Sequence, residues 1–132
     1  MNDKLETIKN HPLHVSLGVQ EITSELGNAT IKAVVNSYTL NPAGFYHGGV
    51  MYLLLDACAY SGVLSALEPN EDAVTHDIHV SVLRPAKLDD SVFYKSKLVK
   101  RGRSLCFIDV EANSNGKLIA TARITKSIII TK

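Results

Sequence analysis

The sequence contains no tryptophan, only two cysteines and four prolines, and its charges almost cancel. The formal net charge of the 132 residues is +1, which gives no global electrostatic reason to expect a nucleic-acid partner. Without tryptophan, and with its three phenylalanines not interleaved with the basic residues, the chain also lacks a surface for stacking bases. These absences argue against nucleic-acid binding.

Several signatures of other classes are also missing. Cys58 and Cys106 lie in apolar stretches and form no Cys-x-x-Cys motif, which suits a reducing cytosol but leaves a disulfide between them open. The polar segment 1–12 lacks the apolar core of a signal peptide, so we expect a cytoplasmic protein. No Gly-x-Ser-x-Gly elbow is present, which disfavours a serine hydrolase.

The five histidines do not have the spacing of a metal site. His76 and His79 are three residues apart in an expected strand and would face opposite sides of it. His11, His14 and His47 show no ligand spacing with them. We therefore expect no metal and no redox cofactor.

The apolar and turn patterns predict one α+β domain over residues 1–132. The expected elements are a helix over 3–10, strands over 18–26 and 28–36, a long helix over 48–67, and strands over 74–83, 91–101, 104–113 and 117–131. The expected hairpin turns are Gly27-Asn28, Gly102 and Asn115-Gly116. This order predicts an antiparallel sheet wrapped around one central helix.

Strict alternation in strand 74–83 predicts two faces. One would carry Val74, His76, Ile78, Val80 and Val82, and the other Thr75, Asp77, His79 and Ser81.

The long helix is the most informative element. Between Gly48 and Leu67 there is no proline, and Asp56 is the only charged residue. The run is long enough for a membrane span, but a mid-span carboxylate followed directly by strands favours a buried core helix. A lone carboxylate there is costly unless it is paired, hydrogen-bonded or used. His47 and two glycines begin the helix, where unpaired N–H groups favour negative charge, so the segment suggests catalysis.

The ordered set Asn41, His47-Gly48-Gly49 and Asp56 resembles the hotdog-fold acyl-CoA thioesterases, and especially their phenylacetyl-CoA thioesterase-like and thioesterase superfamily member 2-like branch. The resemblance covers nearly the whole chain and extends to the segments 74–77, 84–87, 100–103 and 116–120. It implies a β-sheet wrapped around a helix, homodimers and often homotetramers, and hydrolysis of acyl-CoA thioesters.

The resemblance also implies roles for individual residues. The Gly48 N–H would donate to the oxyanion, and Asp56 would be the nucleophile or the general base. Asn41 and His47 would position the loop and substrate, and Thr75 would help to orient the attacking water. The bare side of Gly49 would allow close packing or close approach of the thioester.

Basic residues near two turns suit the phosphates of coenzyme A. The candidate substrate-binding residues are Arg84, Pro85, Lys100, Arg101, Gly102 and Arg103; an ordinary solvated face is the alternative. Coenzyme A is part of the substrate, so the resemblance implies no other cofactor.

The spacing of Gly48 and Asp56 predicts a site shared by two chains. Eight residues of helix separate them by about 12 Å, whereas a reacting carbonyl must lie roughly 3 Å from both its donor and its base. Two helices packed antiparallel in a homodimer would satisfy both contacts.

Two other functions stay open: a non-catalytic acyl-CoA-binding regulator and an enoyl-CoA hydratase or dehydratase on the same fold. Activated water and an anhydride are equally open as routes.

Overall fold

The computed structural model describes residues 2–131 and arranges them as helices followed by strands around one long helix. Helices α1 (Asn2–Asn10) and α2 (Pro12–Ser16) precede strands β1 (Val19–Glu25) and β2 (Asn28–Val34). The 3-10 turn η1 (Ser37–Thr39) leads to the long helix α3 (Gly48–Leu64). Strands β3 (Glu71–Val82), β4 (Ser91–Arg101), β5 (Leu105–Ser114) and β6 (Lys117–Ile130) complete the fold.

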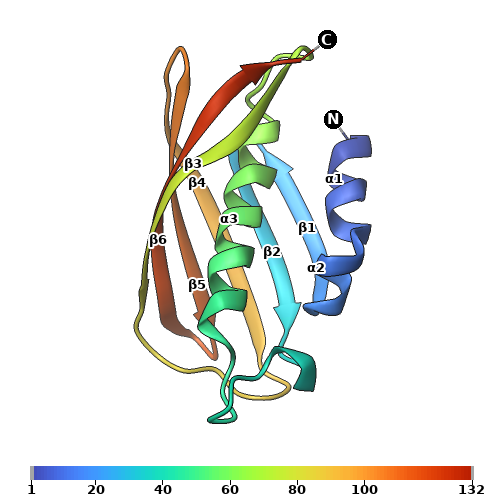
Figure 1. Cartoon of the computed structure of the whole chain (residues 1–132), viewed down its shortest axis with the longest axis vertical. Coiled ribbons are helices and arrows are strands. Elements are labelled where there is room, and N and C mark those ends of the chain that lie inside the picture. Colours follow the sequence, from blue (N-terminus) through green and yellow to red (C-terminus); the bar gives the residue numbers. More distant parts are fainter. Residues whose placement is uncertain (1, 132) are drawn as a thin grey trace.

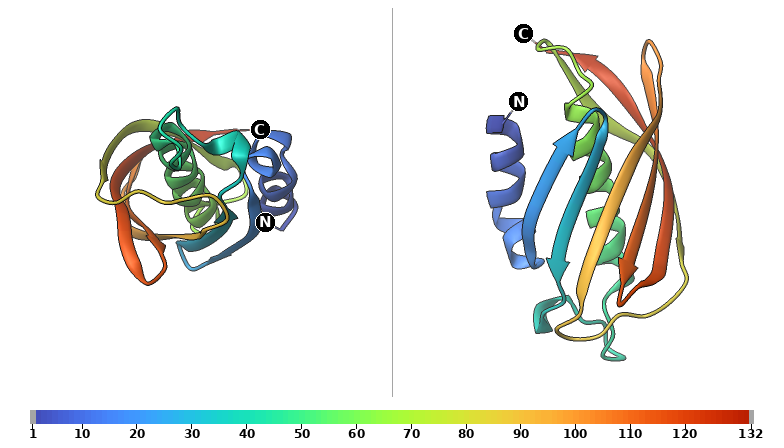
Figure 2. Two further views of the ribbon diagram at one scale, coloured as in Figure 1. Left: turned by 90° about the horizontal axis from the view of Figure 1, so that it is seen from below. Right: turned by 180° about the vertical axis from the view of Figure 1, so that it is seen from behind.

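The six strands form one antiparallel sheet in the order β1-β2-β4-β5-β6-β3. The sheet curves around α3, and α1 lies beside β1 (Figure 1; Figure 2, left). The predicted antiparallel sheet around a central helix is therefore confirmed. The Asn115-Gly116 turn is also confirmed, since both residues have positive φ. The first hairpin turn is Leu26-Gly27 rather than Gly27-Asn28, because Asn28 already pairs with Glu25.

Helix α3 is buried on most sides, as its composition predicts. Leu54, Leu55 and Cys58 are fully buried. A Cβ at Gly62 would lie 2.9 Å from the carbonyl oxygen of Gly27 and 3.2 Å from the Ala29 nitrogen, so this turn of the helix packs directly on the first hairpin. The helix ends at Leu64, three residues earlier than predicted, because Ser65 caps it with its N–H bonded to the Gly62 and Val63 carbonyls.

None of the helices between residues 2 and 131 is long and apolar enough to cross a membrane.

A β-bulge in β3 makes the strict alternation predicted for this strand wrong. Thr75 and Asp77 pair with two successive residues of β6, which leaves His76 as an extra residue between them. Thr75 therefore points towards α3, and Ile78 and Val80 also pack against the core instead of lying on the opposite face from Thr75. The bulge is what allows a polar residue and the apolar residues after it to share the inner face.

Candidate active site

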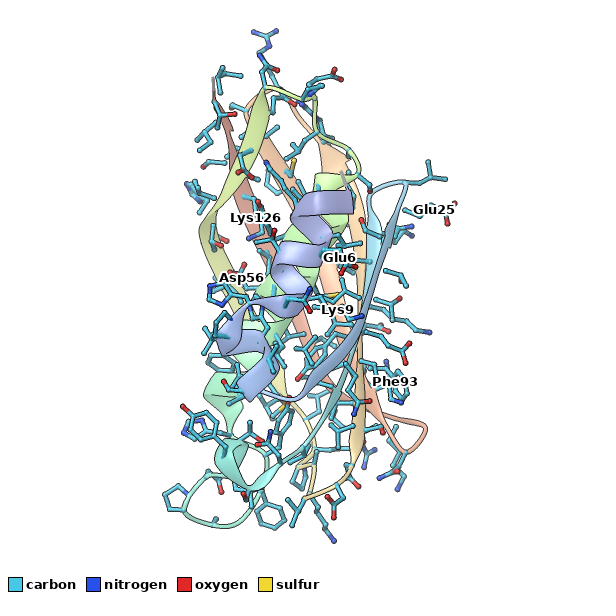
Figure 3. The ribbon with its side chains drawn as sticks, turned by 90° about the vertical axis from the view of Figure 1, so that its right-hand side faces the viewer. Glu6, Lys9, Glu25, Asp56, Phe93 and Lys126 are labelled. Atoms are coloured by element: carbon cyan, nitrogen blue, oxygen red, sulfur yellow. The ribbon has the colours of Figure 1, made fainter. Side chains whose placement is uncertain are left out.

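Three side chains from three elements meet at the middle of α3. The Thr75 hydroxyl on β3 lies 2.9 Å from each carboxylate oxygen of Asp56. The Lys126 ammonium on β6 lies 2.8 Å from Asp56 Oδ1 and 2.9 Å from Thr75 Oγ1. Figure 3 shows Asp56 and Lys126 side by side. The isolated carboxylate noted in the sequence is thus both paired and hydrogen-bonded.

The two charged partners differ in their access to solvent. The Lys126 side chain is 3% exposed, whereas that of Asp56 is 34% exposed. The ammonium also lies 5.7 Å from the centre of the Tyr60 ring, within cation–π range. The cation is therefore enclosed behind the carboxylate, which faces outward.

Tyr60 links this cluster to the N-terminal helix. Its hydroxyl donates to Asp72 at 2.8 Å, and Lys4 of α1 pairs with Asp72 at 3.3 Å. Burial, together with the Asp72 carboxylate, raises the pKa of Tyr60. Burial alone would raise the pKa of Asp72, but hydrogen bonds from Tyr60, the Ala73 N–H and Lys4 outweigh it and hold that pKa below its usual value.

The first turn of α3 is organised by His47. This residue is the N-cap, and its Nδ1 accepts the Gly49 N–H at 2.9 Å. A Cβ at Gly49 would lie 3.2 Å from the imidazole, whereas a Cβ at Gly48 would meet nothing within 4 Å. The Gly48 N–H has no acceptor among residues 2–131. The turn therefore presents one free donor beside open space.

Asn41 stabilises the loop before α3. Its Oδ1 accepts the N–H groups of Ala43 at 2.9 Å and Phe45 at 3.0 Å. The amide oxygen is therefore used within the loop, and a direct contact of Asn41 with substrate stays a prediction.

An apolar pocket of ≈ 480 Å³ has the cluster of Asp56, Thr75 and Lys126 in its wall. Residues of α1, α2 and α3 supply apolar surface, and Asp56, Thr75 and Lys126 line the same pocket. A larger cavity of ≈ 940 Å³ lies along β3, β5 and β6 and includes none of these three residues. We take the smaller cavity as the candidate active site because it joins apolar surface to a carboxylate.

Comparison with known proteins identifies the family. The family model described as "Thioesterase superfamily" matches residues 43–126, which is more than half of the chain. The chain belongs to the thioesterase superfamily. The resemblance found in the sequence, the hotdog fold and thioester hydrolase activity are therefore confirmed.

Individual relatives of this thioesterase are distant but span most of its length. Human acyl-coenzyme A thioesterase 13 is 28% identical over 109 residues, which cover 81% of this chain and 77% of that protein. A Streptococcus pneumoniae thioesterase protein solved with coenzyme A is 27% identical, with a TM-score of 0.81 and coverage of 89% of this chain and 92% of that one. A Streptococcus mutans protein bound to acetyl-CoA is 25% identical, with a TM-score of 0.82 and coverage of 92% and 97%.

The predicted phosphate-binding residues of the thioesterase fall into two groups at opposite ends of α3 (Figure 1). Arg84 and Pro85 are exposed and follow β3, and the Tyr46 N–H donates to the Ala86 carbonyl at 2.9 Å. This hydrogen bond holds the 84–86 segment beside the loop that leads into α3. Arg84 therefore lies at the same end of the fold as Gly48.

The second group occupies the β4–β5 hairpin, near the start of β3. The guanidinium of Arg101 pairs with Glu71 and donates to the Gly102 carbonyl, so it is used within the chain. Lys100 and Arg103 are exposed. A Cβ at Gly102 would lie 2.9 Å from the Leu105 carbonyl oxygen, which explains the glycine by the turn itself. Within one chain, the two groups of basic residues therefore do not lie close together.

The buried thiols are poor candidates for a nucleophile. Cys58 and Cys106 are both free and buried, and they form no disulfide. Burial raises the pKa of Cys58 to about 12, and it also raises the pKa of Cys106. A thiolate is the reactive form, so these residues are inert at neutral pH.

Lys126 is the residue of this site that the sequence reasoning missed. The signal was present, because inner-facing positions of β6 alternate as Ala120, Ala122, Ile124, Lys126 and Ile128. A charged residue within such a series is rarely buried unless it has a partner. That partner, Asp56, is 70 residues away in sequence.

Proposed function

We propose that this thioesterase hydrolyses acyl-CoA thioesters to a free carboxylic acid and coenzyme A. One observation supports the proposal above all: a carboxylate held by two donors lines an apolar pocket that could receive an acyl group. Relatives named as acyl-CoA thioesterases, and similar structures solved with coenzyme A or acetyl-CoA, point to the same substrate class.

In the proposed reaction the thioester carbonyl accepts the free Gly48 N–H, which stabilises the tetrahedral oxyanion. Asp56 takes a proton from water as the water oxygen bonds to the carbonyl carbon. The carbon–sulfur bond then breaks, and the thiolate of coenzyme A takes up the proton from Asp56. In the alternative route Asp56 itself attacks the carbonyl, the carbon–sulfur bond breaks to release the thiolate of coenzyme A, and water then hydrolyses the resulting anhydride.

The proposed site is completed by a second copy of the chain. Gly48 and Asp56 lie on one continuous helix, about 12 Å apart along its axis. Antiparallel packing of two α3 helices across a two-fold axis would bring Gly48 of each chain towards Asp56 of the other.

The surface beside Asp56 suits such a dimer. Strand β3 is an edge of the sheet, and exposed apolar side chains lie on it, after it and on the neighbouring face of α3. They are Tyr52, Val74, Val82 and Leu83. The same antiparallel arrangement would also bring the Arg84 end of one chain towards the Lys100–Arg103 hairpin of the other. The homotetramer and the cytoplasmic location stay predictions.

Thiol release from a panel of acyl-CoA esters tests the function, with enoyl-CoA hydration measured in parallel. We expect thiol release by the wild type and a loss of several orders of magnitude in Asp56→Asn. Retention of more than about a tenth of kcat by the variant would show that the assigned role is wrong. Binding without thiol release would favour a regulator, and hydration would favour the hydratase.

Subunit mixing tests the shared site. Asp56→Asn and Gly48→Val chains should each be inactive, but a mixed dimer places both lesions in one site and leaves the other intact. Activity should recover towards about a quarter of the wild-type value after full exchange, because half of the dimers are mixed and each has one intact site. No recovery despite verified exchange would contradict the shared site.

A further inference from the structure

We propose that Lys126 is a positioning residue of the hydrolysis. Its ammonium directs the hydroxyl group of Thr75 to donate its hydrogen bond to Asp56, and it leaves Oδ2 of that carboxylate as the reacting atom. The inference rests on the proposed function and adds a residue that neither the sequence motif nor the family resemblance assigns.

The direction of each hydrogen bond follows from the chemistry of the three groups. A lysine ammonium carries three donors and no acceptor, so its 2.9 Å contact with Thr75 must donate into a lone pair of the hydroxyl oxygen. The single hydroxyl proton of Thr75 is then directed to Asp56, which lies 2.9 Å away through both of its oxygens. Without the ammonium, the same hydroxyl could rotate and donate elsewhere.

The two oxygens of Asp56 are not equivalent in this arrangement. Oδ1 accepts from Lys126 at 2.8 Å and shares the Thr75 proton. Among residues 2–131, Oδ2 accepts only the shared Thr75 bond. It therefore keeps more free lone-pair capacity for a proton of water or for attack on carbon.

Stability alone does not explain a cation at this position. A nearly buried ammonium loses several kcal/mol of hydration, and buried ion pairs are often no more stabilising than apolar side chains of similar volume. An apolar residue at position 126 would continue the inner-facing series of β6. What the ammonium adds is a fixed geometry and a fixed charge beside Asp56.

Two variants of the 132-residue chain test the inference. Lys126→Met keeps the side-chain length but removes the charge and the donors. We expect kcat to fall by more than tenfold, on the order of the 10²-fold loss that a misplaced catalytic group can cause, while KM changes by less than about threefold. Lys126→Ala should lose kcat similarly, and propylamine, which matches the deleted atoms, should restore it saturably through the adjoining pocket.

Tetramethylammonium, a cation without N–H donors, should give no restoration, which separates hydrogen bonding from charge alone. Direct aminolysis of the thioester is subtracted with Asp56→Asn at the same amine concentration. Lys117→Met, an exposed change on the same strand, is the matched control and should leave kcat unchanged. Circular dichroism verifies folding, and Lys126→Gln replaces the Met variant if that variant does not fold.

The outcomes separate the two proposals. An active wild type, an inactive Asp56→Asn and a Lys126→Met that keeps kcat within tenfold would overturn the role of Lys126 alone. Failure of propylamine to restore Lys126→Ala would also overturn it. A wild type that releases no thiol from any acyl-CoA would overturn the proposed function and this inference together.

Discussion

Replacing Asp56 by asparagine should destabilise the fold as well as remove the proposed catalytic group. The sequence alone suggests that Asp56→Asn leaves the fold largely intact, because no partner for the carboxylate is visible in it. The structure reveals that partner: the Lys126 ammonium, 2.8 Å away and 3% exposed. In the variant this cation stays buried without an anion.

The magnitude follows from the burial of each partner. Removing one member of a fully buried ion pair costs about 3–5 kcal/mol. Asp56 is 34% exposed, and an asparagine carbonyl can still accept from Lys126, so we expect a smaller loss of about 2 kcal/mol. For a chain of this size that corresponds to a melting temperature lower by roughly 6–10 °C. Removing both charges, in Asp56→Asn with Lys126→Met, should recover most of the loss.

Chemical and thermal denaturation, followed by circular dichroism, measure the stability of the wild type, Asp56→Asn, Lys126→Met and the double variant. All four proteins are compared at one concentration, because association would raise the apparent melting temperature. Asp56→Asn with a stability equal to or above that of the wild type would refute the reasoning. So would a double variant that is less stable than Asp56→Asn, since the unpaired ammonium would then not be the source of the loss.

Four further substitutions should have separable effects. Gly48→Val should lower kcat by roughly 10²–10³-fold with little change in melting temperature. His47→Ala should lower kcat less, and the loss of the N-cap should lower the free energy of unfolding by about 1 kcal/mol. Equal losses of kcat in the two variants would contradict this order. The Arg101 guanidinium holds the pKa of Glu71 below its ordinary 4.5, so its stabilisation is present above pH 4.5 and is lost as the pH falls through the lowered value. Arg101→Gln should therefore be less stable than wild type at pH 6, and this difference in stability should shrink as the pH falls below 4.5; a difference that does not change with pH would contradict the pair. Leu13→Trp, in the pocket wall, should lower kcat/KM for octanoyl-CoA relative to acetyl-CoA by roughly tenfold, and an unchanged ratio would move the acyl site elsewhere.

The parts of the fold that depend on local pattern could be predicted from the sequence. The uninterrupted apolar run of α3 predicts a buried helix, and Asn115-Gly116 predicts a hairpin turn, because each pattern depends on residues only a few positions apart. The end of α3 was less predictable, because Ser65 closes the helix with its backbone and its hydroxyl accepts the Gly27 N–H from the first hairpin.

The cluster of Asp56, Thr75 and Lys126 could be predicted only in part. Asp56 and Thr75 were named from the family motif, but strict alternation placed Thr75 on the opposite face from Ile78. One extra residue, His76, reverses that alternation, and no single residue type predicts a bulge. Lys126 comes from a strand 70 residues beyond Asp56, and its pairing depends on the strand order β6-β3, which short-range patterns do not specify.

In the His47-Gly48-Gly49 turn, the two glycine N–H groups have different roles, which follow from the general properties of helix N-termini. The first turn of any helix has N–H groups without intrahelical acceptors, and an N-cap side chain satisfies one of them. Here the imidazole of His47 takes the Gly49 N–H, and a Cβ at Gly49 would press on that ring at 3.2 Å. Within the described residues the N–H of Gly48 has no acceptor, and there is open space where its Cβ would be. The second glycine thus serves the cap, and the first keeps its N–H available, as the proposed role of oxyanion donor requires.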